Sequence, residues 1–225
     1  MLRRRFEGEL KRLQDEVLGL GYAVQRAITE AVDGLKVRNL DVSQQIIAGD
    51  SEINRKRFQI EADVLVLIAT QQPMARDLRA LAAILDIIRE LERTGDYAKG
   101  IAKISLNIGE EELIKPLLDI PRMSEKAMDM LGRALRAYID NDDRSAREIA
   151  LEDDEVDGLY NQVRHELVTL ILADPSRVEQ ANMLLWAAHN LERAADRVTN
   201  ICERVVFSAT GELGELPNSP DQSDA

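Results

Sequence analysis

The sequence predicts an all-α protein of six helices, arranged as two symmetry-related three-helix bundles. Apolar residues recur every three or four positions through most of the chain, and no segment alternates with the period of two that a strand requires. Aromatic residues make up only 4% of the 225 residues and charged residues 31%, a balance that favours long helices over a β-sandwich. The sequence Leu-Glu-Arg-x-x-Asp at residues 91–96 recurs at residues 191–196, which indicates an internal repeat.

Prolines divide the periodic stretches into helices, because proline disrupts the interior of a helix. Pro73 separates the second predicted helix from the third, Pro116 precedes the fourth, which begins at Pro121, and Pro175 separates the fifth from the sixth. In chain order, the predicted helices cover residues 6–37, 41–70, 74–108, 121–139, 142–173 and 176–208. Helices of about 30 residues are ~45 Å long and, when short loops join them, form antiparallel bundles.

The third and sixth predicted helices carry the clearest apolar faces. Residues of these faces step by three and four: Ile84, Ile88, Leu91, Gly95, Ala98 and Ala102 on the third, and Leu184, Ala187, Leu191, Ala194, Val198, Ile201 and Val205 on the sixth. Such a stripe buries one side of a helix against a core. We therefore expect these two helices to be central in their bundles.

The repeat sets the expected domain organisation. A second pair of similar segments, at residues 50–54 and 153–157, supports one three-helix unit in each half of the chain. We expect the first bundle over residues 1–112 and the second over 113–210. Residues 211–225 hold Gly, Pro, Ser and acidic residues with no apolar pattern, and they are expected to form a disordered acidic tail.

The net charge of −12, from 41 acidic and 29 basic residues, excludes a general nucleic-acid binder and disfavours an exposed anion site. The single cysteine, Cys202, rules out an internal disulfide and a cysteine-based zinc site, and it is expected to be buried. No apolar run approaches the about 20 residues that span a bilayer, and the basic residues near the start precede no apolar segment. We expect a soluble cytoplasmic protein, which could still rest on a membrane protein or a membrane surface.

Acidic residues spaced by four occur at matching depths on the last two predicted helices. Glu192 and Asp196 point the same way from one helix, and Asp153 and Asp157 from the other. Counted from the turn at Pro175, Asp157 comes level with Glu192, and Asp153 with Asp196. Four carboxylates at one level repel each other, so their pKa values rise, a cation binds, or the side chains turn into water. All-oxygen donors suit Mg, Ca, Mn or iron in its higher oxidation state.

The first half repeats this set with one change. Its members are Asp50, Asn54, Glu92 and Asp96, and Asn54 stands where the second half has an acid. One ligand charge fewer is expected to lower the affinity or the number of metal ions there. The alternative for both sets is an ordinary solvated face with local arginine pairs.

Other candidate site residues carry weaker signals. His189 shares a face with the second acidic set, but its counterpart in the first half is Arg89, which favours a surface position. His165 is expected to be structural or exposed. Arg93 and Arg193 point away from the apolar faces, where they either bridge the bundles, touch a partner or form local ion pairs. No Glu-x-x-His, Gly-rich phosphate loop or Ser/His/Asp pattern is visible, so no catalytic residue is predicted.

Several segments resemble the PhoU family of phosphate-transport regulatory proteins of bacteria and archaea. Glu-Arg-Thr-Gly-Asp at 92–96 and Glu-Arg-Ala-Ala-Asp at 192–196 are similar to the family's two Glu-Arg-Ile-Gly-Asp segments. The segments at 153–160 and 196–203 also resemble the family. The resemblance covers about residues 6–207 in the same order and spacing, and it implies a fold of two three-helix bundles.

The resemblance also implies metal ions, iron or zinc in clusters that can hold more than one ion. By motif match, the implied ligands are Asp153, Asp157, Glu192 and Asp196 in the second bundle, and Asp50, Glu92 and Asp96 in the first. Asn54 departs from the acidic pattern and weakens the expectation for the first bundle.

The implied role is negative regulation of phosphate uptake and of phosphate-starvation signalling. The implied partners are the phosphate ABC transporter, through its ATPase subunit, and a sensor histidine kinase, with peripheral membrane association through them. A homodimer is also implied. Two alternatives remain open from the residues: a carboxylate-bridged metalloenzyme or metal-storage bundle, and a structural bundle with solvated acids.

Overall fold

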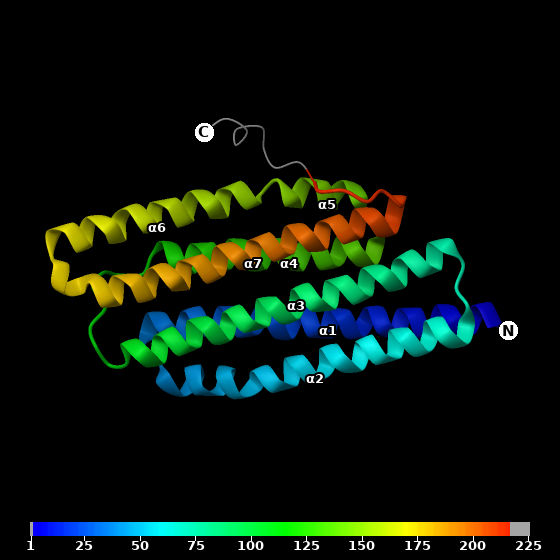
Figure 1. Cartoon of the computed structure of the whole chain (residues 1–225), viewed down its shortest axis with the longest axis horizontal. Coiled ribbons are helices and arrows are strands. Elements are labelled where there is room, and N and C mark those ends of the chain that lie inside the picture. The colour runs from blue at the N-terminus through cyan, green and yellow to red at the C-terminus, as the bar shows by residue number, and fades with distance from the viewer. Residues whose placement is uncertain (1, 217–225) are drawn as a thin grey trace.

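Helices make up almost the whole of the computed structural model, which describes residues 2–216 (Figure 1). Within that range all regular secondary structure is helical. The elements are α1 (Leu2–Val37), α2 (Leu40–Gln71), α3 (Ala75–Ile108), α4 (Asp119–Asp140), α5 (Asp143–Ala150), α6 (Asp153–Ala173), the short 3₁₀ turn η1 (Pro175–Arg177) and α7 (Val178–Thr210). The all-α prediction is confirmed, and most of the predicted helix ends agree to within a few residues.

The fifth predicted helix is the exception, because it is divided into α5 and α6 at Leu151 and Glu152. The backbone N–H of Glu152 donates a hydrogen bond to the carbonyl of Ile149 in a tight turn. The carboxylate of Glu152 accepts a hydrogen bond of 2.7 Å from Arg133 and lies 2.7 Å from Nζ of Lys126, both on α4. The prediction of one continuous helix is therefore wrong, and the break occurs where two long-range ion pairs hold the chain.

The helices pack in two groups that share one core. α1, α2 and α3 contact one another. In the second group α4 and α7 contact each other, and each of them contacts α5 and α6. α3 against α7 and α1 against α4 join the groups. Figure 1 shows α3 and α7 side by side along the middle of the molecule. The predicted apolar faces of both helices are buried along their length. The acidic motifs on these helices are thus carried by the two most central elements.

The contact between α1 and α4 is close because Gly21 has no side chain. A Cβ at Gly21 would overlap the side chain of Leu135, which is buried on α4. One turn further along α1, the Gln25 side chain donates a hydrogen bond of 2.6 Å to the backbone carbonyl of Met128. Gly21 therefore lets the two groups of helices approach at this level.

Gly21→Val is expected to lower the free energy of unfolding by about 1–3 kcal/mol, because the added methyl groups overpack a filled interface. Gly19→Val is the matched control, since a Cβ at Gly19 on the same helix meets nothing within 4 Å. Thermal melting of the two variants measures the difference. Equal melting temperatures would contradict a tight α1–α4 contact at Gly21.

The chain after α7 folds back on the helices. Glu212 pairs with Arg147 of α5 at 2.6 Å, and the backbone N–H of Leu216 donates to Glu203 of α7 at 3.1 Å. Residues 211–216 of the predicted disordered tail are thus irregular but in contact with helices, and 217–225 lie outside the described residues. In residues 2–216, none of the helices combines the length and the apolar character needed to cross a membrane.

Candidate metal centre

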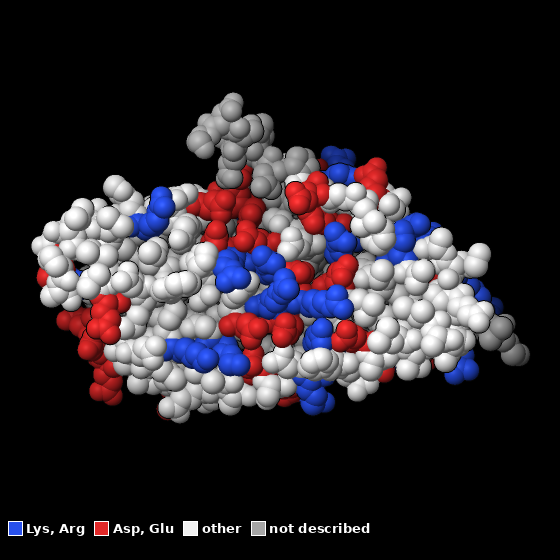
Figure 2. Space-filling view, in the orientation of Figure 1, with Lys and Arg blue, Asp and Glu red and all other residues white. Residues whose placement is uncertain are grey.

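The second acidic set lies where the start of α6 faces the middle of α7. Asp153 and Asp157 occupy the first two turns of α6, and Glu192 and Asp196 lie one turn apart on α7. All four side chains are half-buried. In Figure 2, acidic side chains gather over the start of α6 and the middle of α7, and again over the middle of α3, with a band of basic side chains between them.

The pKa values of this set show that the carboxylates affect one another. Burial, followed by the charges of Asp196, Asp157 and Glu192, raises the pKa of Asp153 to about 7. Burial and then Asp196 raise the pKa of Glu192, with a further contribution from Asp157. Among the carboxylates, Asp196 therefore has the largest effect on Asp153, and Asp157 also raises the pKa of Glu192. Counting from the turn at Pro175 pairs the same residues across the hairpin, Asp153 with Asp196 and Asp157 with Glu192.

Two carboxylate oxygens of the set are buried, and they differ in their neighbours. Oδ1 of Asp153 and Oε2 of Glu192 accept no hydrogen bond from any residue within 2–216. Nδ1 of His189 lies 3.2 Å from Oε2 of Glu192, and His189 lowers the pKa of that carboxyl, whereas Oδ1 of Asp153 has no such neighbour. His189 keeps the partial exposure expected of a surface residue, with 35% of its side chain exposed, but its ring also lies beside Glu192 and 5.6 Å from the ring of Trp186.

The first acidic set is arranged differently. Asp50 on α2 is buried, and its Oδ2 accepts hydrogen bonds from Nζ of Lys99 at 2.6 Å and from Nδ2 of Asn54 at 3.3 Å. Burial, followed by Asp96, raises the pKa of Glu92. Burial and Asp50 raise the pKa of Asp96, although the Asp96 side chain is exposed. The deepest acid of this set is therefore neutralised by a cation of the protein itself.

The two sets differ in how well they fit a metal ion. Over residues 2–216, no three His, Cys, Asp or Glu side chains have their donor atoms already gathered to hold a metal. Like-charged carboxylates repel, so such a set does not converge by itself. The second set fits an ion, because the buried Oδ1 of Asp153 accepts no hydrogen bond from the described residues, and the buried Oε2 of Glu192 has only the imidazole of His189 beside it at 3.2 Å. The first set does not fit as it stands, because Lys99 and Asn54 engage the buried oxygen of Asp50.

The remaining candidate residues are accounted for by packing and pairing. The guanidinium of Arg193 on α7 lies 5.0 Å from the ring centre of Tyr97 on α3, so it bridges the two groups of helices. Arg93 pairs with Glu90 on its own helix at 3.8 Å. Cys202 is fully buried, which raises the pKa of its thiol to about 12, and His165 is exposed. We assign none of these to the acidic sets.

Lys99 is the residue that the sequence interpretation missed. A lysine three positions after Asp96 looks like an ordinary solvated residue of a helix, and only the fold brings it to Asp50. The available signal was the repeat, because the equivalent position in the second half holds Thr199. A charge present in one copy and absent from the other indicates that the two copies differ in their electrostatics.

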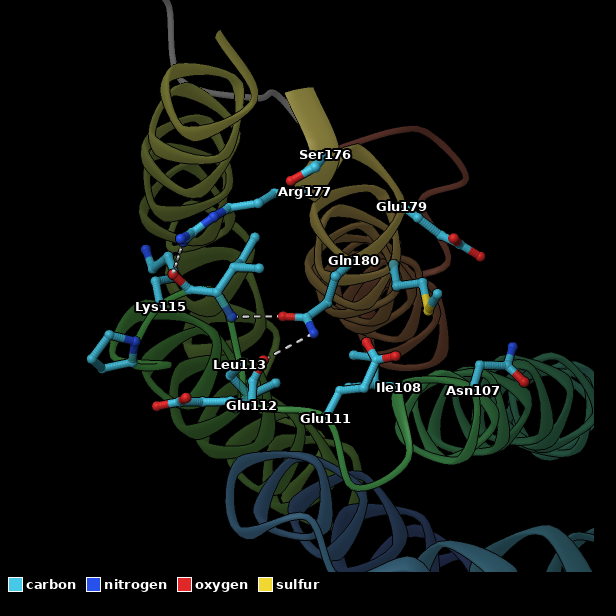
Figure 3. Close-up of a pocket in the computed structure, with 13 residues that line it drawn as sticks. Asn107, Ile108, Glu111, Glu112, Leu113, Lys115, Ser176, Arg177, Glu179 and Gln180 are labelled. Carbon is cyan, nitrogen blue, oxygen red and sulfur yellow. Dashed lines mark hydrogen bonds between the residues drawn. The ribbon is translucent and has the colours of Figure 1, made fainter. Parts of the chain in front are cut away.

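A pocket lies away from both acidic sets. It has a volume of about 770 Å³ and lies between the end of α3, the α3–α4 connection and the start of α7 (Figure 3). Gln180, buried on α7, accepts a hydrogen bond from the N–H of Ile114 at 2.6 Å and donates one to the carbonyl of Glu112 at 3.1 Å. These hydrogen bonds hold the α3–α4 connection against α7. None of the seven predicted metal ligands lines the pocket.

Comparison with known proteins assigns the chain to a family. The PhoU domain model matches residues 17–105 and again 120–205. A phosphate-specific transport system accessory protein PhoU homolog from Clostridium acetobutylicum is 34% identical over 217 residues, which are 96% of this chain and 99% of that protein. The homolog from Aquifex aeolicus is 34% identical over 205 residues, 91% of this chain and 93% of that protein.

Solved structures agree in fold. The crystal structure of the phosphate transport system regulatory protein PhoU from Streptococcus pneumoniae superposes with a TM-score of 0.87 at 32% identity, covering 94% of this chain and all of that one. PhoU from Pseudomonas aeruginosa gives a TM-score of 0.87 at 29% identity, covering 92% of this chain and all of that one. The chain belongs to the PhoU family.

Proposed function

We propose that this chain is a negative regulator of phosphate uptake and of phosphate-starvation signalling. The observation that carries the proposal is the match of the PhoU domain to both halves of the chain. Relatives that align over nearly their whole length are named as accessory proteins of the phosphate-specific transport system. A structural neighbour is described as a regulatory protein of phosphate transport.

The regulator acts as a non-enzymatic adaptor in the cytoplasm. Its long helices offer extended faces to two partners, the ATPase subunit of the phosphate ABC transporter and a sensor histidine kinase. It reaches the membrane through these partners, and it works as a homodimer. The net charge of −12 fits protein partners better than nucleic acid, because phosphate backbones are bound by basic surfaces.

The proposed function includes metal ions that bind at the second acidic set. The ligands are Asp153, Asp157, Glu192 and Asp196, and iron or zinc is the proposed occupant, with Mg, Ca or Mn as alternatives. When bound, the ions supply positive charge that neutralises the carboxylates. The support is the buried Oδ1 of Asp153, which accepts no hydrogen bond from the described part of the chain, beside three further half-buried carboxylates.

Deleting the gene is expected to raise the output of a phosphate-starvation reporter in cells grown with abundant phosphate, because the kinase would no longer be restrained. Deleting the kinase gene as well should return the output to its repressed level. Reporter output is measured in both strains and in a strain complemented with this chain. Unchanged output in the single deletion would contradict the regulatory role.

A metalloenzyme is the second candidate, and one observation favours it. Asp153 has a pKa of about 7 and lies in the same cluster as Glu192 and His189. Perturbed pKa values of this kind also occur in acid–base catalysts. Phosphatase and ferroxidase assays distinguish the candidates: turnover that Glu192→Ala abolishes would favour the enzyme, and an inactive, metal-loaded protein favours the adaptor.

A further inference from the structure

We propose that Lys99 is the built-in cation of the first acidic set, and that this chain therefore binds metal only at the second. The proposal rests on the proposed metal function of the second set. It concerns a difference between the two copies of the motif, which the shared acidic residues alone do not reveal. The ammonium group of Lys99 neutralises the buried carboxylate that a metal ion would otherwise need.

The two equivalent deep carboxylates have opposite surroundings. Oδ2 of Asp50 accepts a hydrogen bond from Nζ of Lys99 at 2.6 Å and another from the Asn54 amide at 3.3 Å. Asp153, the equivalent residue in the second half, has a buried Oδ1 that no described residue hydrogen-bonds. A buried carboxylate requires a partner charge, and within residues 2–216 Asp50 is paired with a cation whereas Oδ1 of Asp153 has no hydrogen-bond partner.

Two residues near the first set are positively charged, whereas their counterparts near the second are neutral. Thr199 occupies the position equivalent to Lys99, and its hydroxyl donates to the backbone carbonyl of Asp196 at 2.7 Å, so it contributes no charge. Arg57, which lowers the pKa of Glu92, has the uncharged Tyr160 as its counterpart. Arg57 is itself paired with Glu61 at 2.8 Å, so Lys99 is the cation in contact with the first set, at a position where the second set has the neutral Thr199.

The arginines near the second set do not remove this difference. Arg197 and Arg193 lower the pKa of Asp196, but each side chain is engaged elsewhere. The guanidinium of Arg197 lies 3.3 Å from Glu90 on α3, and that of Arg193 lies over the ring of Tyr97. Neither reaches the unbonded oxygen of Asp153.

A metal ion at the first set would have to displace Lys99 from Asp50. It would then find one carboxylate fewer than at the second set, because Asn54 offers only a neutral amide oxygen. Both differences weaken binding, since a hard cation is held by the charge and number of its oxygen ligands. We therefore expect one metal-loaded acidic set in each chain, the second.

A reciprocal exchange of Lys99 and Thr199 tests the proposal, with Zn²⁺ as the probe in calorimetric titration and elemental analysis. Thr199→Lys places an ammonium beside Asp153 and is expected to weaken Zn²⁺ binding by at least tenfold. In a chain whose second set is disabled by Asp153→Asn and Asp196→Asn, Lys99→Thr is expected to create Zn²⁺ binding that the unexchanged chain lacks. Zn²⁺ bound at the first set with Lys99 in place would overturn the proposal.

A second readout does not depend on metal. With EDTA present, Lys99→Thr is expected to lower the melting temperature, because Asp50 keeps its charge and loses its partner. Adding Asp50→Asn should restore the melting temperature. If Lys99→Thr left it unchanged, Lys99 would not neutralise Asp50. If the unaltered chain bound no Zn²⁺ at all, the proposed metal function would fail, whereas the melting result would still decide the role of Lys99.

Discussion

Replacing Asp196 with alanine is expected to reduce the metal content of the purified protein by at least tenfold, because a carboxylate of the proposed second-bundle centre is removed. Asp196 lies near Asp153, the residue with the most perturbed carboxyl of the cluster, and burial raises the pKa of Asp196 itself. Its loss takes away both a donor oxygen and a negative charge.

The equivalent change in the first bundle, Asp96→Ala, is the matched control and is expected to have a small effect. Asp96 is exposed, and the nearby Asp50 is already paired with Lys99. Elemental analysis of the two variants and the unaltered chain, purified in parallel, measures the contrast. Equal losses of metal from Asp196→Ala and Asp96→Ala would refute the proposed asymmetry of the two bundles.

Asp153→Asn is expected to stabilise the metal-free protein at pH 8, because it removes a charge that the fold disfavours. The folded state raises the pKa of Asp153 from 3.8 to about 7. Between these values the folded chain binds more protons than the unfolded chain, so the stability of the metal-free protein falls as the pH rises. Allowing for solvent screening of a half-buried group, we expect a gain of about 1–2 kcal/mol at pH 8, or about 3–6 °C in melting temperature.

Thermal melting in EDTA at several pH values from about 5 to 8 checks this expectation. The unaltered chain should melt at a lower temperature at the upper end of the range, and Asp153→Asn should remove most of that decline. Asp154→Asn is the control, because Asp154 lies in the same first turn of α6 and contributes least to the raised pKa of Asp153. A decline that persists unchanged in Asp153→Asn would place the responsible group elsewhere.

The helices could be predicted from the sequence because each buries a continuous apolar face. On α7 the predicted face from Leu184 to Val205 is buried at every position, since the three-and-four spacing places all its residues on one side. The break between α5 and α6 could not be predicted in this way. It depends on Glu152, which Arg133 and Lys126 hold from a different helix, and local periodicity carries no information on such contacts.

The depth of the acidic residues along the helices could be predicted, but their surroundings could not. Counting from the turn at Pro175 placed Asp153 near Asp196, because two antiparallel helices advance by the same rise per residue. The partner of Asp50 was not predictable, since Lys99 reaches it from another helix. The comparison of His189 with Arg89 could not show the contact with Glu192, because Arg89 pairs instead with Glu61 and Asp86.

A crystal structure of the purified chain, with anomalous scattering recorded at the edge of the metal found in it, tests the central claim most directly. We predict an anomalous peak beside Asp153, Asp157, Glu192 and Asp196, and none beside Asp50, where Nζ of Lys99 should stay within hydrogen-bonding distance. A peak of comparable height at both sets, with Lys99 displaced, or a metal bound away from both sets, would contradict it.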